Sequence, residues 1–242
     1  MIDPTILRFQ SKREAKERIG ESFWSTFCAG ALYIMPVFAL TMMTMLLPFV
    51  MEEYPLWIDG ALYLAELLIV SPLAYGFGLY CVSRSRGLQV PFFMVFEPLG
   101  SLRSYFRAVS VAFFIALRLL PITAVRLLLI YTVPLESAIY PIADVLIGLG
   151  SVIETVLHLA MTASYNIILD NPAISSWQAV KEARDLYSGQ LFSLAAFIIS
   201  FIGWMILAVI SMGLLLPYLS AYQNISFARM TDLLRFPEQP ME

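Results

Sequence analysis

The sequence predicts an all-α protein, a polytopic bundle of about six transmembrane helices, and three observations support this class. Hydrophobic residues make up 60% of the 242 residues and charged residues only 14%, with a mean hydropathy of +0.77. A soluble domain of this length needs more charge to cover its surface. The apolar residues also form runs long enough to cross a bilayer, and the basic residues occupy alternate connections between those runs.

A helix needs about 20 apolar residues to cross the hydrocarbon core of a membrane. The expected spans are residues 23–50, 56–82, 108–133, 137–168, 190–210 and 213–230. Polar residues such as Gln223 and Asn224 dilute the sixth run, but no charged residue occurs between Asp185 and Arg229. That gap is long enough for two short spans joined by a turn near residues 211–213.

The distribution of basic residues predicts the topology, because Lys and Arg accumulate on the cytoplasmic side of membrane proteins. All but two of the 15 basic residues lie before the first span, in the second and fourth connections, or at and beyond the end of the sixth run. The exceptions, Arg118 and Arg126, lie within the third span. A sixth span places Arg229 and Arg235 on the same side as the other basic residues, so both termini are expected to be cytoplasmic.

The spans define one transmembrane domain, residues 23–235, followed by a tail at 236–242. Residues 1–22 mix basic with acidic residues and lack an apolar core, so we expect a cytoplasmic interfacial helix rather than a cleaved signal. Residues 176–188 begin with a capping-box pattern and are expected to form a second cytoplasmic surface helix. Residues 88–100 are apolar but too short to span, which favours an in-plane cytoplasmic segment over a re-entrant loop.

Ionisable residues inside the spans are the candidate functional residues, because a charge at the bilayer centre costs about 2.5–3.5 kcal/mol on insertion scales. Glu66 lies in the second span, Arg118 and Arg126 in the third, and Glu154 and His158 in the fourth. Glu154 and His158 are one helical turn apart and share a face. In a structural interpretation, the two glutamates neutralise the two arginines, or an arginine snorkels to the interface. In a functional one, the five residues form a polar conduit that binds an anionic group or relays protons.

Several classes of protein are excluded because their motifs are missing. The sequence has no Walker A motif and no GxSxG, and its single His excludes the two-His pattern of zinc proteases. We therefore expect no catalytic residues, no cofactor and no metal site. The net charge of −3 argues against a nucleic-acid partner.

A series of short motifs occupies the last third of the chain. Its members are Asp170, Asn171 and Pro172, then Gly189, then Phe201, Gly203 and Trp204, and finally Pro217 and Tyr218. Over about residues 160–235 this series resembles a bacterial membrane family catalogued as domain of unknown function 975. That family is distantly similar to the membrane domain of some glycerophosphodiester phosphodiesterases, although no phosphodiesterase domain is present here. The resemblance implies a polytopic bacterial membrane protein and no particular activity.

The motif residues also have folding roles that physical chemistry predicts. Asp170 and Asn171 can cap backbone amides where the fourth helix ends, and Pro172 prevents its continuation. Gly189 permits a sharp turn into the fifth span. Gly203 is expected to let a neighbouring helix approach closely.

The leading hypothesis is a non-enzymatic component of the cytoplasmic (inner) membrane, acting as a scaffold or an accessory of transport or peptide handling. The alternative is a transporter or a lipid- or anion-binding protein that uses the five intramembrane ionisable residues. The expected partner is the lipid bilayer. Small residues such as Gly30 and Gly148 leave room for a membrane-protein partner or a homo-oligomer.

Overall fold

The computed structural model describes residues 4–51, 56–133 and 139–236, and every regular element in this part of the chain is a helix, as the sequence predicts. The elements are α1 (Pro4–Gly20), α2 (Phe23–Val50), α3 (Leu56–Ala65), the π-helical turn η1 (Glu66–Val70), α4 (Ser71–Ser85), the 3₁₀ segment η2 (Phe92–Gly100), α5 (Leu102–Thr132), α6 (Tyr140–Thr162), α7 (Ser164–Asp170), α8 (Ser176–Tyr187), α9 (Leu191–Ile199), α10 (Ile202–Ile210) and α11 (Leu216–Arg235). The predicted tail beyond residue 236, residues 1–3, and the start of the predicted fourth span at 137–138 lie outside the described residues.

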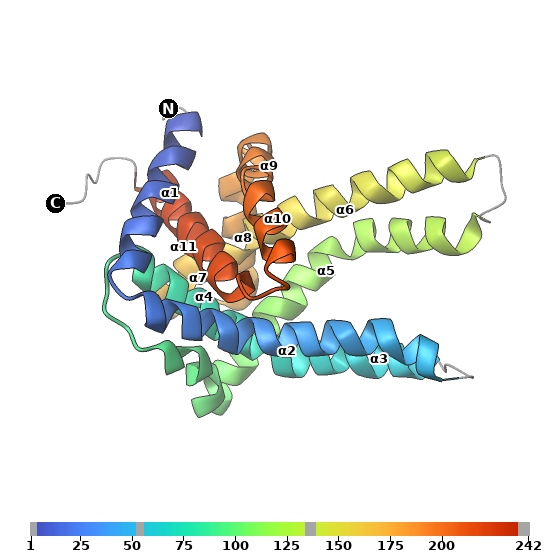
Figure 1. The fold of residues 1–242 in the computed structure, drawn as a ribbon, viewed down its shortest axis with the longest axis horizontal. Helices are drawn as coiled ribbons and strands as arrows, with labels where there is room; N and C mark the ends of the chain where they lie inside the picture. The colour runs from blue at the N-terminus through green and yellow to red at the C-terminus, as the bar shows by residue number, and fades with distance from the viewer. Residues whose placement is uncertain (1–3, 52–55, 134–138, 237–242) are drawn as a thin grey trace.

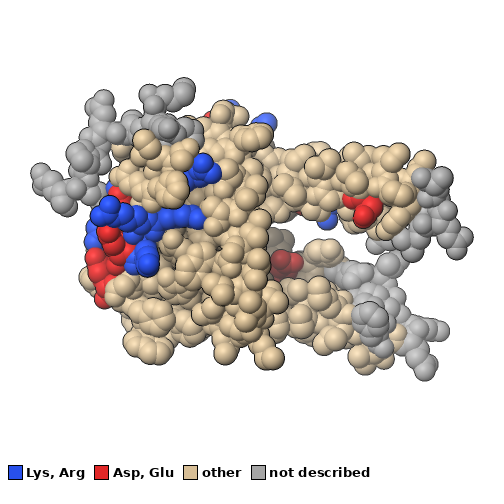
Figure 2. All heavy atoms as spheres, turned by 45° about the horizontal axis from the view of Figure 1, so that its top comes forward, with Lys and Arg blue, Asp and Glu red and all other residues tan. Residues whose placement is uncertain are grey.

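Two helical hairpins project side by side from a common base (Figure 1). The first hairpin consists of α2, α3 and η1, and the second consists of α5 packed along α6. The base, called the head below, consists of α1, α4, η2, α7, α8 and α11. The remaining helices, α9 and α10, pack against α1, α6 and α11. Figure 2 shows that the charged side chains on this face gather mainly over the head, whereas the hairpins are largely uncharged.

Five helical stretches are long and apolar enough to cross a membrane, namely residues 23–47, 60–85, 102–130, 140–170 and 191–210. They correspond to the first five predicted spans. The third begins earlier than predicted because α5 includes Arg103 and Arg107, which the charge pattern assigned to the preceding connection. Ser101 caps this earlier start, with its hydroxyl oxygen accepting a hydrogen bond from the Ser104 amide at 3.2 Å.

The predicted sixth span is a helix, α11, but it is not among the five stretches that could span a membrane by length and composition. It packs against α1, α2 and α4, and its second half is largely buried, with Ser226, Thr231 and Asp232 almost inaccessible. The low charge of this region therefore also serves packing inside the head. A membrane-spanning role for residues 213–230 stays a prediction.

The predicted N-terminal surface helix is α1, and one of its faces packs on α11. Leu7, Ser11, Ala15 and Ile19 recur every four residues and are all buried, which places them on a single stripe. Phe9 lies off this stripe and is exposed. The helix is therefore attached to the protein along one side.

Glycines permit two close contacts between helix backbones, one between α2 and α11 and one between α4 and η2. A Cβ at Gly30 of α2 would lie 2.1 Å from the Pro217 carbonyl oxygen of α11, and a Cβ at Gly76 of α4 would lie 2.1 Å from the Val95 carbonyl oxygen of η2. Only glycine permits such backbone contacts. The close approach predicted at Gly203 is wrong, because a Cβ there would meet open space.

Candidate functional site

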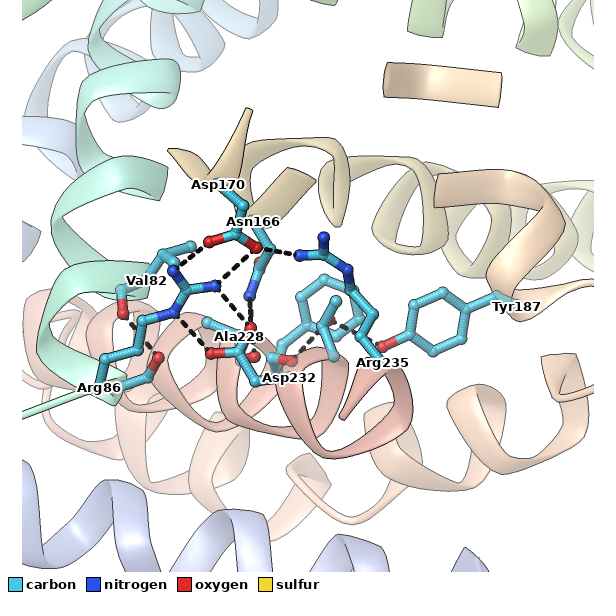
Figure 3. A network of polar contacts seen from close by, with 11 residues as sticks. Val82, Arg86, Asn166, Asp170, Tyr187, Ala228, Asp232 and Arg235 are labelled. Atoms are coloured by element: carbon cyan, nitrogen blue, oxygen red, sulfur yellow. Dashed lines mark hydrogen bonds and ion pairs between the residues drawn. The ribbon is translucent and has the colours of Figure 1, made fainter. Parts of the chain in front are cut away.

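The most extensive polar site in the described residues lies in the head, where α4, α7 and α11 meet (Figure 3). Arg86, just after α4, lies between Asp170 at the end of α7 and Asp232 of α11. Its Nε and Nη2 donate to the two Asp232 carboxylate oxygens at 2.8 Å each, and its Nη1 donates to Asp170 Oδ1 at 2.5 Å. Arg235 forms an ion pair with the other Asp170 oxygen. The fork of Arg86 thus joins two carboxylates from helices far apart in the sequence.

The charges of this site balance, since two guanidinium groups face two carboxylates. The pKa of Arg86 is raised, mainly by its hydrogen bonds to Asp232, with burial opposing this effect and Asp170 adding to it. Asn166 of α7 completes the site by donating to Asp232 Oδ1 at 2.9 Å and to the Ala228 carbonyl oxygen at 3.1 Å. With their strongest donors committed to carboxylates, these arginines are suited to holding three helices together.

Neighbouring contacts join the other helices of the head to the same site. Tyr187 of α8 is fully buried and its hydroxyl lies 2.9 Å from the Thr231 hydroxyl of α11. Burial raises the pKa of the Tyr187 phenol, which keeps it neutral. On the α1 side, the Glu14 carboxylate forms an ion pair with Arg229 of α11, and the buried Arg84 donates to the Arg18 carbonyl oxygen at 2.9 Å.

The loop that follows α7 is held by α5. Arg107 donates to the carbonyl oxygens of Pro172 and Ile174 at 2.7 and 2.8 Å. The Asn171 side chain accepts a hydrogen bond from the Ala173 amide at 3.2 Å, as expected for a residue that caps the backbone. Asp170 does not share this role, because its carboxylate is bound to the two guanidinium groups of the head.

Two of the five intramembrane residues predicted from the sequence form an ion pair in the second hairpin. Arg126 of α5 pairs with Glu154 of α6, and the Thr123 hydroxyl donates to the same carboxylate at 2.6 Å. Gly150 makes room for this contact, since a Cβ there would lie 2.9 Å from Cγ of Arg126.

Of the other three residues, Arg118 and Glu66 have different surroundings from this pair, whereas His158 lies one helical turn from Glu154. The guanidinium carbon of Arg118 lies 4.2 Å from the ring centre of Trp177 in α8, a cation–π contact. His158 is exposed on α6. Glu66 belongs to the first hairpin, where it lines a pocket between α2 and α3. The structure therefore does not bring the five residues into one polar cluster.

The later motif residues gather in an aromatic group between α10 and α11. Phe201 is buried with its ring 5.3 Å from that of Tyr222, and the Trp204 ring lies 5.9 Å from Tyr218 and 5.8 Å from Tyr222. Lys12 of α1 reaches the same place, with its Nζ 3.9 Å from the centre of the Phe201 ring. Burial lowers the pKa of the Lys12 ammonium, and the nearby Arg8 lowers it further.

The structure shows the predicted start of α8, with its capping residue, and the predicted turn at the end of this helix. The Ser175 hydroxyl oxygen accepts from the Gln178 amide at 3.3 Å, which confirms Ser175 as the N-cap of α8, the first half of the predicted capping box. The Gln178 side chain accepts from the Ser175 hydroxyl at 3.0 Å. Gly189 lies in the turn between α8 and α9, where the chain was expected to turn. Pro217 opens α11, and its backbone is the one that Gly30 contacts.

Sequence reasoning missed most of the charged site in the head. Arg86 and Arg235 served only as markers of topology, and neither Asn166 nor Asp232 was singled out. One signal was present, because Asn166 lies four residues before Asp170 and so on the same helical face. Among the described residues, no group of three or more acidic, His or Cys side chains is placed to hold a metal ion.

The long apolar helices and the charge-paired head define a multi-pass α-helical membrane protein. The family described as "Protein of unknown function (DUF975)" matches residues 10–230, which is most of the 242-residue chain. The chain belongs to this family. No curated protein and no solved structure matches it significantly.

Proposed function

We propose that the protein is a non-enzymatic membrane scaffold that presents its second hairpin, α5 and α6, to a membrane-protein partner. The observation that carries this proposal is the pairing of charges. Arginines of the head are bound to aspartates, and Arg126 of the hairpin is bound to Glu154. Charge is used here to hold helices together, which suits a structural component of the membrane.

Apolar side chains on the second hairpin offer the surface for such a partner. Residues exposed on its two helices are Leu120, Val125 and Leu128 of α5, and Val145, Leu149 and Val152 of α6. Helix association in lipid depends on close packing rather than on hydrophobicity, so small residues favour it. Gly148 lies among these α6 residues, and a Cβ there would meet open space.

The alternative, an anion conduit built from the five intramembrane residues, has less support. Such a site needs guanidinium groups that converge on a shared space. Arg126 already faces a carboxylate, Arg118 lies over Trp177, and Glu66 is in the other hairpin. A transport accessory that acts through protein contacts fits this arrangement better.

The proposal includes a location and an orientation. The basic residues of the head suggest that it faces the cytoplasm and that both termini are on that side, in the cytoplasmic membrane of a bacterium. This orientation requires α11 to return the chain to the cytoplasmic side. The comparisons do not show the expected similarity to the membrane domain of glycerophosphodiester phosphodiesterases, and the proposal does not rest on it.

The scaffold proposal can be tested by photo-cross-linking in cells. A benzophenone amino acid replaces Val145 or Leu128, both exposed, in the full chain at native expression. We expect a discrete protein adduct at both positions, identified by mass spectrometry. The adduct should persist in the Arg126→Ala/Glu154→Ala double variant if this still folds. Adducts with lipid alone at both positions would contradict the proposal.

A further inference from the structure

Glu66 differs from the other intramembrane carboxylates in its surroundings, because it lines a pocket. The pocket has a volume of about 200 Å³ and lies between α2 and the α3–η1 segment. Its walls are Val37, Leu40, Thr41, Thr44, Leu62, Tyr63, Glu66 and Val70. A single water needs only about 10–15 Å³ of such volume, so the pocket has room for a small organic group.

The two threonines in the wall present acceptors to this pocket. The Thr41 hydroxyl donates its hydrogen to the Val37 carbonyl oxygen at 2.9 Å, and the Thr44 hydroxyl donates to the Thr41 carbonyl oxygen at 2.8 Å. A hydroxyl group has one hydrogen and two lone pairs. With the hydrogens committed to the backbone, both hydroxyls offer lone pairs, as does the Glu66 carboxylate.

The helix is widened at Glu66, and this widening is stabilised from the neighbouring helix. The Ser71 amide donates to the Glu66 carbonyl oxygen, five residues back, instead of four. The Tyr105 hydroxyl of α5 donates to the Leu68 carbonyl oxygen at 2.9 Å. Such π-helical turns are frequent at functional sites. Here the turn begins at the residue that carries the charge of the pocket.

The charge of Glu66 is not balanced by the described residues, since none of them forms an ion pair with it. Glu66 lies within the second candidate span, about 9 Å along the helix from Gly60. A carboxylate at this depth needs a cationic partner or a proton. Arg126, Arg229, Arg86 and Arg235 are bound to other carboxylates. Arg118 lies over the Trp177 ring.

We propose that this pocket binds a primary ammonium carried on an alkyl chain, with Glu66 as its counter-ion. The ammonium has three donors, which match the carboxylate and the lone pairs of Thr41 and Thr44. Leu40 and Leu62 contact the alkyl chain. The same chemistry is offered by a free amine and by the headgroup of phosphatidylethanolamine. This inference goes beyond the scaffold function and does not depend on it.

The test measures binding of radiolabelled hexylammonium to the full chain in phosphatidylcholine nanodiscs by equilibrium dialysis. We expect saturable binding that unlabelled hexylammonium competes for and hexanol does not. Glu66→Gln should weaken it by about tenfold or more, because charge-assisted hydrogen bonds are lost. Thr41→Val should weaken it by about fivefold, as for one neutral hydrogen bond.

Asp144→Asn is the matched control, because Asp144 is an exposed carboxylate of α6 that does not line the pocket. It should bind hexylammonium as the wild type does. Equal competition by hexanol, or unchanged binding by a folded Glu66→Gln variant, would overturn the proposal. Weaker apparent binding in nanodiscs that contain phosphatidylethanolamine supports a lipid as the source of the ammonium. Equal binding in the two kinds of nanodisc supports a free amine.

Discussion

The head and the two hairpins differ in how their charged side chains are surrounded. In the head, Arg86 is bound to both Asp170 and Asp232, and each of these carboxylates has a further donor, from Arg235 or Asn166. In the second hairpin, one arginine faces one glutamate. In the first hairpin, Glu66 has no ionic partner among the described residues.

The number of polar partners for each charged residue thus falls from the head to the first hairpin. This difference shows where the molecule needs its charges for folding. The head joins helices that are remote in sequence, and directional hydrogen bonds can fix their order in a way that apolar packing cannot. The hairpins consist of sequence neighbours that meet in lipid and need fewer polar contacts. A charge that stays unpaired in a hairpin is therefore the one most open to a ligand. The following variants test that ranking.

The largest decrease in the free energy of unfolding is expected for Asp232→Ala. The substitution removes both acceptors of the Arg86 fork and leaves a half-buried guanidinium with Asp170 alone. Breaking a buried ion pair by removing one partner costs about 3–5 kcal/mol. Unfolding by urea in detergent micelles measures this loss, with Asp144→Ala as the exposed control. A loss below about 1 kcal/mol would show that the head does not depend on the network.

A smaller decrease in the free energy of unfolding is expected for Arg126→Ala. This substitution leaves Glu154 inside a span without its cationic partner. The upper limit is the insertion cost of a central charge, about 2.5–3.5 kcal/mol, and the Thr123 hydroxyl reduces it. The double variant Arg126→Ala/Glu154→Ala should recover part of the stability, because no charge remains unpaired. A double variant no more stable than the single one would argue against pairing.

Gly76→Ala tests the backbone contact between α4 and η2. The added Cβ would collide with the Val95 carbonyl oxygen, so the two segments must separate. Overpacking of this kind costs about 1–3 kcal/mol. Gly203→Ala is the matched control, since its Cβ meets open space and alanine favours the helix. Thermal melting in detergent should fall for the first variant and stay level or rise for the second.

The smallest effect is expected for Arg13→Gln on the outer face of α1. Arg13 and Glu17 form an ion pair at 3.2 Å, but their side chains are 83% and 62% exposed. Exposed pairs of this spacing contribute about 0.3–0.5 kcal/mol. The melting temperature should therefore change little. A decrease in stability as large as that of Asp232→Ala would contradict the expected difference between this exposed ion pair and the partly buried network around Arg86.

The local features of the fold were accessible from the sequence. Hydropathy predicted α2 with both of its ends, residues 23 and 50, because an apolar run in lipid needs no partner to be recognised. The cap of α8 was also predicted, since Ser175 and Gln178 are close in sequence. The start of α5 was missed because Arg103 was taken for a connection residue.

Long-range contacts were not accessible in the same way. Nothing local relates Arg86 to Asp232 or Gly78 to the Tyr165 ring, because those contacts depend on how distant helices pack. The five intramembrane residues were grouped because each is ionisable and lies inside a predicted span. The structure separates them because Glu66 and the other four belong to different hairpins. Low charge alone likewise does not decide whether residues 213–230 span a membrane or pack in the head, where the second half of α11 is buried.

The spacing of the head network sets an order for biosynthesis. Arg86 and Asp232 are 146 positions apart in the chain. At synthesis rates of about 5–20 residues per second, Asp232 is synthesised about 7–30 s after Arg86. Both hairpins precede Asp232 in the chain, and α11, which carries it, closes the head. The two hairpins can therefore form before the ion pairs that join α4, α7 and α11 in the head.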